Sequence, residues 1–397
     1  MEYIVLTIIG LSFFTYSISI RQLESVEITG PMFFVLVGML IAYLLPNEVK
    51  NLDYEYISLL PFIELTLSIF LFTDAAKTKL NVLKHSYHYP SLLLFIALPL
   101  TLLLGIATAS FMFADLTLIQ SALVAIILTP TDAALSKALL TNESVPEKIR
   151  EGINTESGLN DGLCVPIFLI LMVFAQEPKT SFTLLSAAAI FTRELGLALL
   201  IAVIAMSIFI PFIRYAMNHH YFSNNSSPFL VIGITATIFS IAQYFQSSGF
   251  IAVFVAGLIF GRHTEHKLKE KLVEDSEHIA DFTGLLIWCI FGFVCSYVVF
   301  PVLTWQLIIF ALLSTTLIRI LPVMLSLLFT KLAIKERFTF AWFGPRGLAS
   351  IVFTMMVIDT SIENKNQIAA IALTTILMSV FIHGMSTKPI TDSYKKK

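Results

Sequence analysis

Charged side chains are scarce in this sequence. Asp, Glu, Lys and Arg make up 13% of its 397 residues, about half the share that is usual in soluble domains. Apolar residues make up 57%, and the mean hydropathy is +0.84. A soluble protein this apolar could not cover its own surface with polar groups, so the composition favours a chain that spans a lipid bilayer.

Cysteine is also rare, and the balance of charge is close to neutral. The three cysteines, Cys164, Cys289 and Cys295, lie inside apolar runs, which excludes a disulfide framework and a cysteine metal site. The net charge of −2 favours no nucleic-acid partner. The first 21 residues lack a basic start and a small-residue cleavage pattern, so we expect a retained first span.

Apolar runs fill most of the chain, which we interpret as a single polytopic transport domain over residues 1–397. Most of these runs are about long enough for one helix across the bilayer. The ninth is short, and the seventh and eleventh are long enough to be tilted or to include an interfacial stretch. The thirteen predicted segments cover residues 3–20, 28–46, 56–74, 88–113, 118–140, 150–176, 183–217, 228–246, 248–261, 282–300, 302–330, 338–358 and 366–388.

The positions of Lys and Arg predict the orientation of these segments. With the N-terminus outside, 19 of the 25 Lys and Arg fall at cytoplasmic ends, three fall in outer loops and three fall within spans. This bias follows the positive-inside rule, and it predicts an external N-terminus and a cytoplasmic C-terminus in a cell (inner or plasma) membrane. The only sizeable polar stretch, 262–281, is predicted to be a solvated cytoplasmic connector.

A few ionisable residues lie within the apolar segments, where each one is costly and therefore marks function by default. Asp74 lies near the end of a span. We assign Glu64 a packing or interface role. Arg193 and Glu194 can neutralise each other. The other candidates are Asp132, Glu156, Asp161, Arg319 and Arg346.

Two of the apolar segments are interrupted by proline and glycine. Pro130 stands in the fifth segment between Thr129 and Thr131, next to Asp132, and Gly344-Pro345-Arg346-Gly347 interrupts the twelfth. Proline removes a backbone donor, and broken helices in transporters line ion sites. The two breaks lie about 215 residues apart, which predicts inverted repeats with two crossed discontinuous helices. The alternative for the first break is a simple kink capped by Asp132.

The sixth segment carries two pairs of polar residues at helical spacing. Ser157 and Asp161 share one face, and Glu156 and Asn160 share the adjacent face. Because burial disfavours a bare carboxylate, Asp161 is suited to hold either a proton or a desolvated cation. The alternative is a structural carboxylate paired with a cation such as Arg346. Arg319 needs an acidic partner, for which Glu156 is the natural candidate and Arg346 the competing arginine.

At these residues the chain resembles the cation:proton antiporter-1 family, in particular the bacterial NhaP-type sodium/proton antiporters. The matching blocks are FLFTDAAKTKL at 70–80, TPTDAALSK at 129–137, EGINTESGLNDG at 151–162 and WFGPRGLASIVF at 342–353, with weaker ones at 253–262 and 285–292. The resemblance implies an all-α integral membrane fold with an NhaA/NhaP-like core and a dimerisation domain. We expect the core in residues 88–176 and 302–388 and the dimerisation domain in 1–75 and 183–300.

The resemblance also implies a role for each matching residue. Asp161 would bind the ion and the proton, with Asp132 supporting it and Thr131 and Ser157 supplying oxygens. Asn160 would link the broken helix to the ion-binding helix. Glu156 would form a structural ion pair with Arg319 that holds the core, with Arg346 as the competing partner. Asp74 and Thr129 are possible further ion-site residues.

The implied activity is electroneutral exchange of Na⁺ or Li⁺ for H⁺ by a homodimer in the lipid bilayer, with no cofactor and no enzymatic activity. The chain ends soon after the last segment, so we expect no cytoplasmic regulatory tail. A K⁺/H⁺ antiporter with the same site is the main alternative. A cation channel and an intramembrane aspartyl protease are remote ones, since no repeated pore loop and no Gly-x-Gly-Asp block is present.

Overall fold

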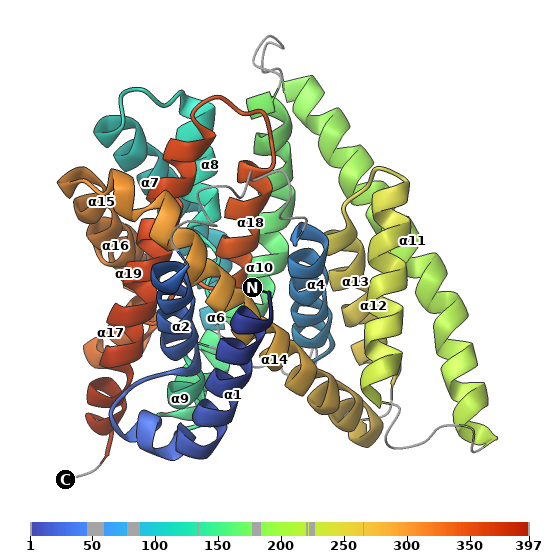
Figure 1. Ribbon diagram of the computed structural model, residues 1–397. Helices are drawn as coiled ribbons and strands as arrows, with labels where there is room; N and C mark the ends of the chain where they lie inside the picture. Colours follow the sequence, from blue (N-terminus) through green and yellow to red (C-terminus); the bar gives the residue numbers. More distant parts are fainter. Residues whose placement is uncertain are drawn as a thin grey trace. The chain divides into compact units, whose positions relative to one another are not determined.

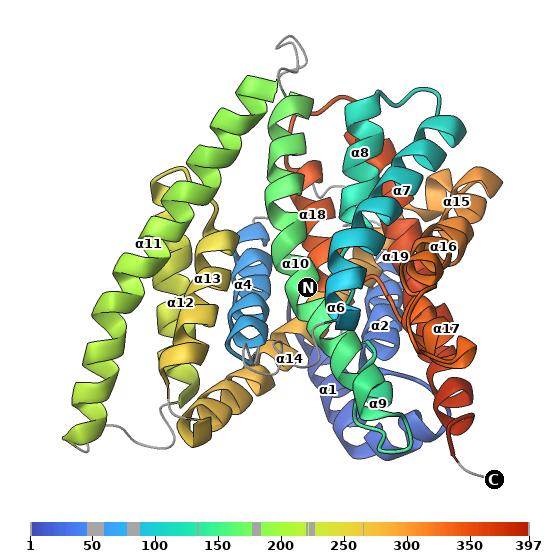
Figure 2. The same ribbon diagram turned by 180° about the vertical axis from the view of Figure 1, so that it is seen from behind.

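The computed structural model describes residues 2–45, 59–77, 88–132, 135–176, 184–219, 221, 227–264 and 266–395. The described part consists of helices and their connections, with no strand, as the sequence predicts (Figures 1 and 2). In chain order the helices are α1 (Glu2–Ser25), α2 (Gly30–Leu44), α4 (Leu60–Lys77), α6 (His88–Leu92), the π-helical turn η2 (Leu93–Ala97), α7 (Leu98–Met112), α8 (Leu118–Ile127), α9 (Lys137–Leu140), α10 (Glu147–Gln176), α11 (Leu184–Asn218), α12 (Ser227–Tyr244), α13 (Gly249–His263), α14 (His266–Val298), the 3₁₀ turn η4 (Phe300–Val302), α15 (Trp305–Thr315), α16 (Leu317–Ser326), α17 (Ile334–Trp342), α18 (Leu348–Ile358) and α19 (Lys365–Asp392).

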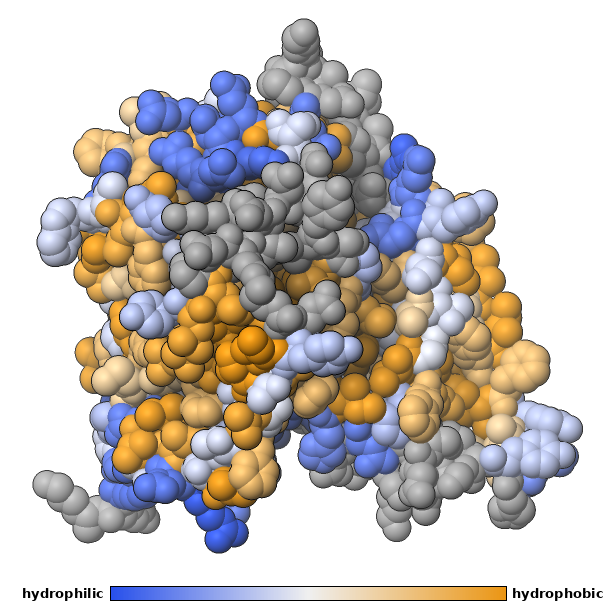
Figure 3. Space-filling view, in the orientation of Figure 1, coloured by the Kyte–Doolittle hydropathy of each residue, from blue (hydrophilic) through white to orange (hydrophobic). Residues whose placement is uncertain are grey.

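Each of the thirteen predicted segments coincides with one helix or with one interrupted helix. Among the described residues, seven helical stretches are long and apolar enough to cross a bilayer, and five shorter apolar helices accompany them. The chain is therefore a multi-pass membrane protein, and the exact number of spans stays a prediction. In the left-hand part of Figure 3, hydrophobic side chains fill most of the middle height and hydrophilic ones gather toward the top and bottom.

The polar stretch 262–281 is helical from His266, where α14 begins, and not a loop as predicted; its position on the cytoplasmic side stays a prediction. The first turns of α14 are rich in Lys, Glu and Leu, which are good helix formers. Val273, Ser276 and Ala280 are buried at helical spacing, so this polar stretch has one packed face. The many charged residues of this segment indicated that it is exposed to solvent, but they gave little sign that its buried residues recur at helical spacing.

The long eleventh segment is interrupted rather than tilted as one rod. α15 ends at Thr315, and Thr316 has backbone angles of φ −116° and ψ −91° that belong to neither helix. The hydroxyl groups of Thr315 and Thr316 both donate to carbonyls of the preceding turn, a local hydrogen bond that competes with regular helix and often bends it. The interruption places Arg319 in the first turn of α16.

Two compact units can be distinguished in the chain. The first contains residues 1–60, 89–157 and 284–397, and the second contains residues 61–88 and 158–283. α10 and α14 each belong to both units. In the first unit, α19 packs against α15, α18 and α8; in the second, α13 packs against α11 and α12. The division into a transport core and a dimerisation domain stays a prediction.

Close helix crossings in both units depend on glycine. In the first unit, a Cβ atom at Gly38 of α2 would lie 1.9 Å from the Cys289 carbonyl oxygen of α14, and one at Gly292 would lie 2.1 Å from the Val35 oxygen. In the second, a Cβ at Gly261 of α13 would lie 2.3 Å from the Ala76 oxygen of α4. Small residues let helix backbones touch in this way inside membranes.

We therefore expect Gly38→Ala to destabilise the protein by about 1–3 kcal/mol, because the added methyl group forces α2 away from α14. The measurement is the thermal unfolding midpoint of the detergent-solubilised protein. Gly10→Ala in α1 is the matched control, since nothing lies within 4 Å of a Cβ atom at that position. An equal midpoint for the two variants would contradict the close crossing.

Candidate functional site

Both predicted helix breaks are present, and they contact each other within the first unit. α8 ends at Ile127, three residues before Pro130, and α17 and α18 are separated by residues 343–347. The backbone N–H of Asp132 donates to the Pro345 carbonyl oxygen at 2.9 Å. The two interrupted helices therefore cross at their non-helical segments, where the backbone groups of one satisfy those of the other.

The carboxylate of Asp132 lies at the N-terminus of α18. Its Oδ2 atom accepts a hydrogen bond of 3.2 Å from the backbone N–H of Leu348, the first residue of that helix. A helix N-terminus has unpaired N–H groups and a partial positive charge, which stabilise a carboxylate. Asp132 does cap a helix, but a helix that lies 216 residues away in the sequence rather than its own.

Two glycines of the second break make these approaches possible. A Cβ atom at Gly347 would lie 1.9 Å from Asp132 Oδ2, and one at Gly344 would lie 2.6 Å from Arg319 Nε. Neither glycine has a positive φ, so the requirement is for space and not for conformational freedom. The sequence pattern identified these glycines as helix breakers, but it could not show which side chains they make room for.

Arg319 and Glu156 form the ion pair that the sequence predicts. Arg319 Nη2 lies 2.6 Å from Oε1 and 2.8 Å from Oε2 of Glu156, and both side chains are only 2% exposed. Arg346 instead donates to backbone carbonyls, from Nη1 to Gly344 at 3.0 Å and from Nη2 to Ser314 at 3.2 Å. The two buried guanidinium groups thus have different partners, and both hold the region around the second break together.

Two of the predicted ligand oxygens lie next to each other. The hydroxyl oxygens of Thr131, in the first break, and Ser157, on α10, are 3.2 Å apart, and both residues are buried. Thr129 donates its hydroxyl to the Ala125 carbonyl at 2.7 Å, where it caps the end of α8. The arrangement supplies hydroxyl oxygens of the kind that small cations bind.

α10 continues past Ser157 without a break and carries Asn160 and Asp161 one turn further on. Asn160 is 1% exposed and accepts a hydrogen bond from the Cys164 thiol, with 3.0 Å between Sγ and Oδ1. Asp161 is partly buried. Because α10 is one regular helix, Ser157 and Asp161 lie on the same face of it, as the spacing predicts.

Asp74 approaches the same helix within the second unit. It lies on α4, and a Cβ atom at Gly158 of α10 would be only 3.4 Å from its Cβ and 3.9 Å from its Cγ. Gly158 and Asp161 are three residues apart and therefore share a helix face. Sequence reasoning missed this approach of Asp74 to α10, where even a methyl group at Gly158 would be in ordinary contact with the aspartate side chain.

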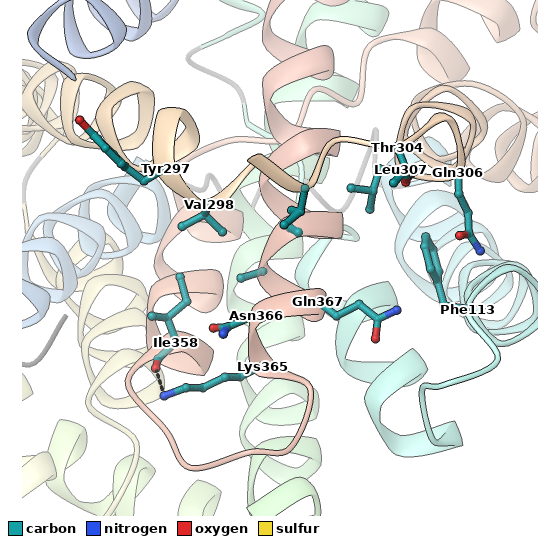
Figure 4. Close-up of a pocket in the computed structure, with 13 residues that line it drawn as sticks. Phe113, Tyr297, Val298, Thr304, Gln306, Leu307, Ile358, Lys365, Asn366 and Gln367 are labelled. Carbon is teal, nitrogen blue, oxygen red and sulfur yellow. Dashed lines mark hydrogen bonds between the residues drawn. The ribbon is translucent and has the colours of Figure 1, made fainter. Parts of the chain in front are cut away.

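A cavity of about 590 Å³ in the first unit lies apart from these residues (Figure 4). It is bounded by the end of α14, the start of α15 and the first turns of α19. Lys365 at its edge donates to the carbonyls of Ile358 and Thr360 at 2.8 and 2.6 Å, which caps the end of α18. None of the predicted ion-site residues lines this cavity.

Comparison with known proteins gives one family and several distant relatives. The family model "Sodium/hydrogen exchanger, transmembrane" matches residues 8–392. The Na⁺/H⁺ antiporter NhaH of Halobacillus dabanensis is 22% identical over 292 residues, 72% of this chain and 71% of that protein. The K⁺/H⁺ antiporter NhaP2 of Shewanella oneidensis is 22% identical over 284 residues, 68% of this chain and 47% of that protein.

The fold has a close match among solved structures. The structure of the sodium proton antiporter MjNhaP1 from Methanocaldococcus jannaschii at pH 8 superposes with a TM-score of 0.79 over the whole of both chains. The two sequences are 19% identical. The arrangement of helices is therefore shared even though most side chains differ.

Proposed function

Because the chain belongs to the sodium/hydrogen exchanger family, whose model matches residues 8–392, we propose that it is a secondary transporter that exchanges Na⁺ or Li⁺ for H⁺ by alternating access. The single observation that carries this proposal is the crossing of the two broken helices, where Asp132 caps α18. Broken helices of this kind are where transporters bind ions. The family consists of transporters, so the protease alternative is dropped.

Asp161 is the proposed binding group for both ions. It lies one turn along α10 from Ser157, whose hydroxyl is 3.2 Å from that of Thr131. A cation at Asp161 would take hydroxyl oxygens from these two residues, while Asp132, held by the N-terminus of α18, supports the site with its negative charge. Asn160 would position the helix, and Asp74 and Thr129 remain possible further contributors.

Coupling follows from the cost of moving charge into the membrane. With a proton or a monovalent cation bound, the Asp161 carboxylate is neutralised, and the moving part can cross the low-dielectric region. With neither bound, the bare carboxylate opposes the crossing. Each transport cycle must therefore carry one ion in each direction, which makes the exchange electroneutral with one proton per cation. The neighbour of Asp161 is Asn160 rather than a second carboxylate, which fits this stoichiometry.

K⁺/H⁺ exchange by the same site is the second candidate, and the similarity to NhaP2 favours keeping it. Na⁺ and K⁺ differ in size, so the choice depends on how many oxygens reach the ion and how rigidly they are held. The hydroxyls of Thr131 and Ser157 are fixed by their mutual contact, which supports a compact site and hence the smaller ion.

Orientation and assembly complete the proposal. The Lys and Arg bias supports an external N-terminus and a cytoplasmic C-terminus in the bacterial plasma membrane. We propose a homodimer, as the resemblance to the NhaP-type antiporters implies, with residues 1–75 and 183–300 in the dimerisation domain and residues 88–176 and 302–388 in the moving core. The exposed apolar side chains of α1, such as Leu6, Phe14 and Ile18, are available to lipid or to a second copy.

The test is exchange in proteoliposomes that contain a pH-sensitive dye. An imposed pH gradient should dissipate on addition of Na⁺ or Li⁺, at the same rate with and without a voltage clamp, and more slowly with K⁺. Faster dissipation by K⁺ would favour the second candidate. Cation movement that is independent of the proton gradient would show a channel and would overturn the proposal.

A further inference from the structure

Two buried polar residues of α19, Ser379 and His383, face the second helix break and have no role in the mechanism so far. Ser379 is 0% exposed and His383 is 1% exposed. They are four residues apart and lie on one face of the helix. A buried imidazole and a buried hydroxyl are costly unless they make specific hydrogen bonds, so their partners indicate what they do.

Ser379 binds the backbone of the break directly. Its Oγ atom accepts a hydrogen bond of 2.8 Å from the backbone N–H of Arg346. Arg346 lies between α17 and α18, where the chain is not helical, so a side chain of another helix takes the place of the usual helical acceptor for this N–H. Ser379 therefore fixes the position of the non-helical segment from the side of α19.

His383 determines how the Ser379 hydroxyl is used. His383 Nδ1 lies 2.8 Å from the Ser379 carbonyl oxygen and 3.1 Å from its Oγ. The carbonyl can only accept, so Nδ1 must carry the hydrogen, and the hydroxyl oxygen lies within reach of that same hydrogen. Ser379 Oγ then accepts from both Arg346 and His383, which its two lone pairs allow.

The imidazole ring is itself held in place. It packs against the ring of Trp342, the last residue of α17, with 5.7 Å between the ring centroids. Trp342 in turn donates its indole N–H to Ser386 Oγ at 2.8 Å. The other ring nitrogen, Nε2, is also buried. Because Nδ1 is the nitrogen that contacts Ser379, it is the one that does the positioning.

The residues on both sides of Arg346 are those that hold Asp132. The Pro345 carbonyl accepts the Asp132 backbone N–H at 2.9 Å, and the Leu348 N–H donates to Asp132 Oδ2 at 3.2 Å. A shift of the Arg346 backbone would move both contacts together. The hydrogen bonds of Ser379 thus influence the position of Asp132 through one short stretch of backbone.

We infer that Ser379 and His383 are positioning residues of the cation site: His383 orients the Ser379 hydroxyl, which holds the α17–α18 break so that it places Asp132. The inference rests on the proposed function, because it assumes that Asp132 supports ion binding. It assigns to α19 a part in setting the affinity for the cation, in addition to its packing against α15 and α18.

The first test replaces Ser379 with alanine and measures exchange in proteoliposomes as a function of cation concentration. We expect the KM for the cation to rise roughly five- to tenfold, the loss that follows from one misplaced hydrogen bond, with a smaller change in kcat. Thr391→Val is the matched control, because it removes a hydroxyl of the same helix that donates to the Lys388 carbonyl of that helix and not to the break. Its KM should be unchanged.

The second test distinguishes positioning from packing at His383. Asparagine can place an N–H group near the position of Nδ1, whereas glutamine places it near Nε2. His383→Asn should keep a KM within about twofold of the parent, and His383→Gln should raise it as Ser379→Ala does. The double variant Ser379→Ala/His383→Gln should be no worse than Ser379→Ala alone, because both changes disrupt the same contact.

An unchanged KM in Ser379→Ala, or equal behaviour of the two His383 variants, would overturn the inference. If a variant yields too little folded protein for kinetics, Ser379→Thr, which keeps the hydroxyl, replaces it. The measurement is then the rise of the thermal unfolding midpoint on addition of the cation. This rise should equal that of the parent protein, and its absence would count against the inference. If the inference about Ser379 and His383 fails, Asp161 is still the proposed binding group. In contrast, exchange that continues after loss of the Asp161 carboxylate would contradict the proposed function itself.

Discussion

Asp161→Asn is expected to abolish exchange driven by a pH gradient, with a reduction of at least about 100-fold. The amide has nearly the same shape as the carboxylate, but it cannot bind a proton reversibly near neutral pH and carries no charge for a cation. A site that is always neutral gives no coupling between the two ions. The measurement is the initial rate of dye recovery in proteoliposomes with equal amounts of protein.

The control for this result is the same chemical change where no role is expected. Asp392→Asn lies at the end of α19, where the carboxylate pairs with Lys395 and is 44% exposed. It should retain full exchange, and both variants should elute as the parent does in size-exclusion chromatography. Coupled exchange that persists in Asp161→Asn would remove this residue from the mechanism.

The second large effect is expected at the buried ion pair. Replacing Glu156 with Gln leaves the Arg319 guanidinium charged and buried, and removing one partner of a buried pair costs about 3–5 kcal/mol. We expect Glu156→Gln and Arg319→Gln each to reduce the yield of folded protein severely. The measurement is the monodisperse fraction after solubilisation, together with its thermal unfolding midpoint.

The double variant Glu156→Gln/Arg319→Gln separates charge from packing. It removes both buried charges at once, so it should recover part of the stability that either single variant loses. Single variants as stable as the parent would show that the pair does not hold the fold. A double variant worse than both single variants would show that the pair acts by shape and not by charge.

The sequence predicted the features that depend on a single segment. Pro130 and the Gly344–Gly347 block broke their helices where expected, since proline lacks a backbone donor wherever it stands. The pairing of Arg319 with Glu156 was also predicted, because few buried groups of opposite charge were available. Such predictions succeed when one physical requirement has few solutions within the chain.

Features that depend on two distant segments could not be predicted in the same way. The contact of Asp132 with Leu348 joins residues 216 positions apart, and nothing in either segment specifies the other. The Ser379 contact with the Arg346 backbone is of the same kind, because a serine in an apolar helix more commonly binds its own preceding turn. The start of α14 was not predicted because this stretch has more charged residues than buried ones, so the helical spacing of its buried residues is hard to recognise in the sequence.

The claim that one carboxylate holds either a proton or a cation is tested most directly by proton release on cation binding. Purified protein in weakly buffered detergent solution is mixed with Na⁺ below the pH at which the site is fully ionised, and a pH indicator counts the protons released. The account predicts release that saturates at no more than one proton per chain and disappears in Asp161→Asn. Cation binding with no proton released, or release that persists in that variant, would contradict it.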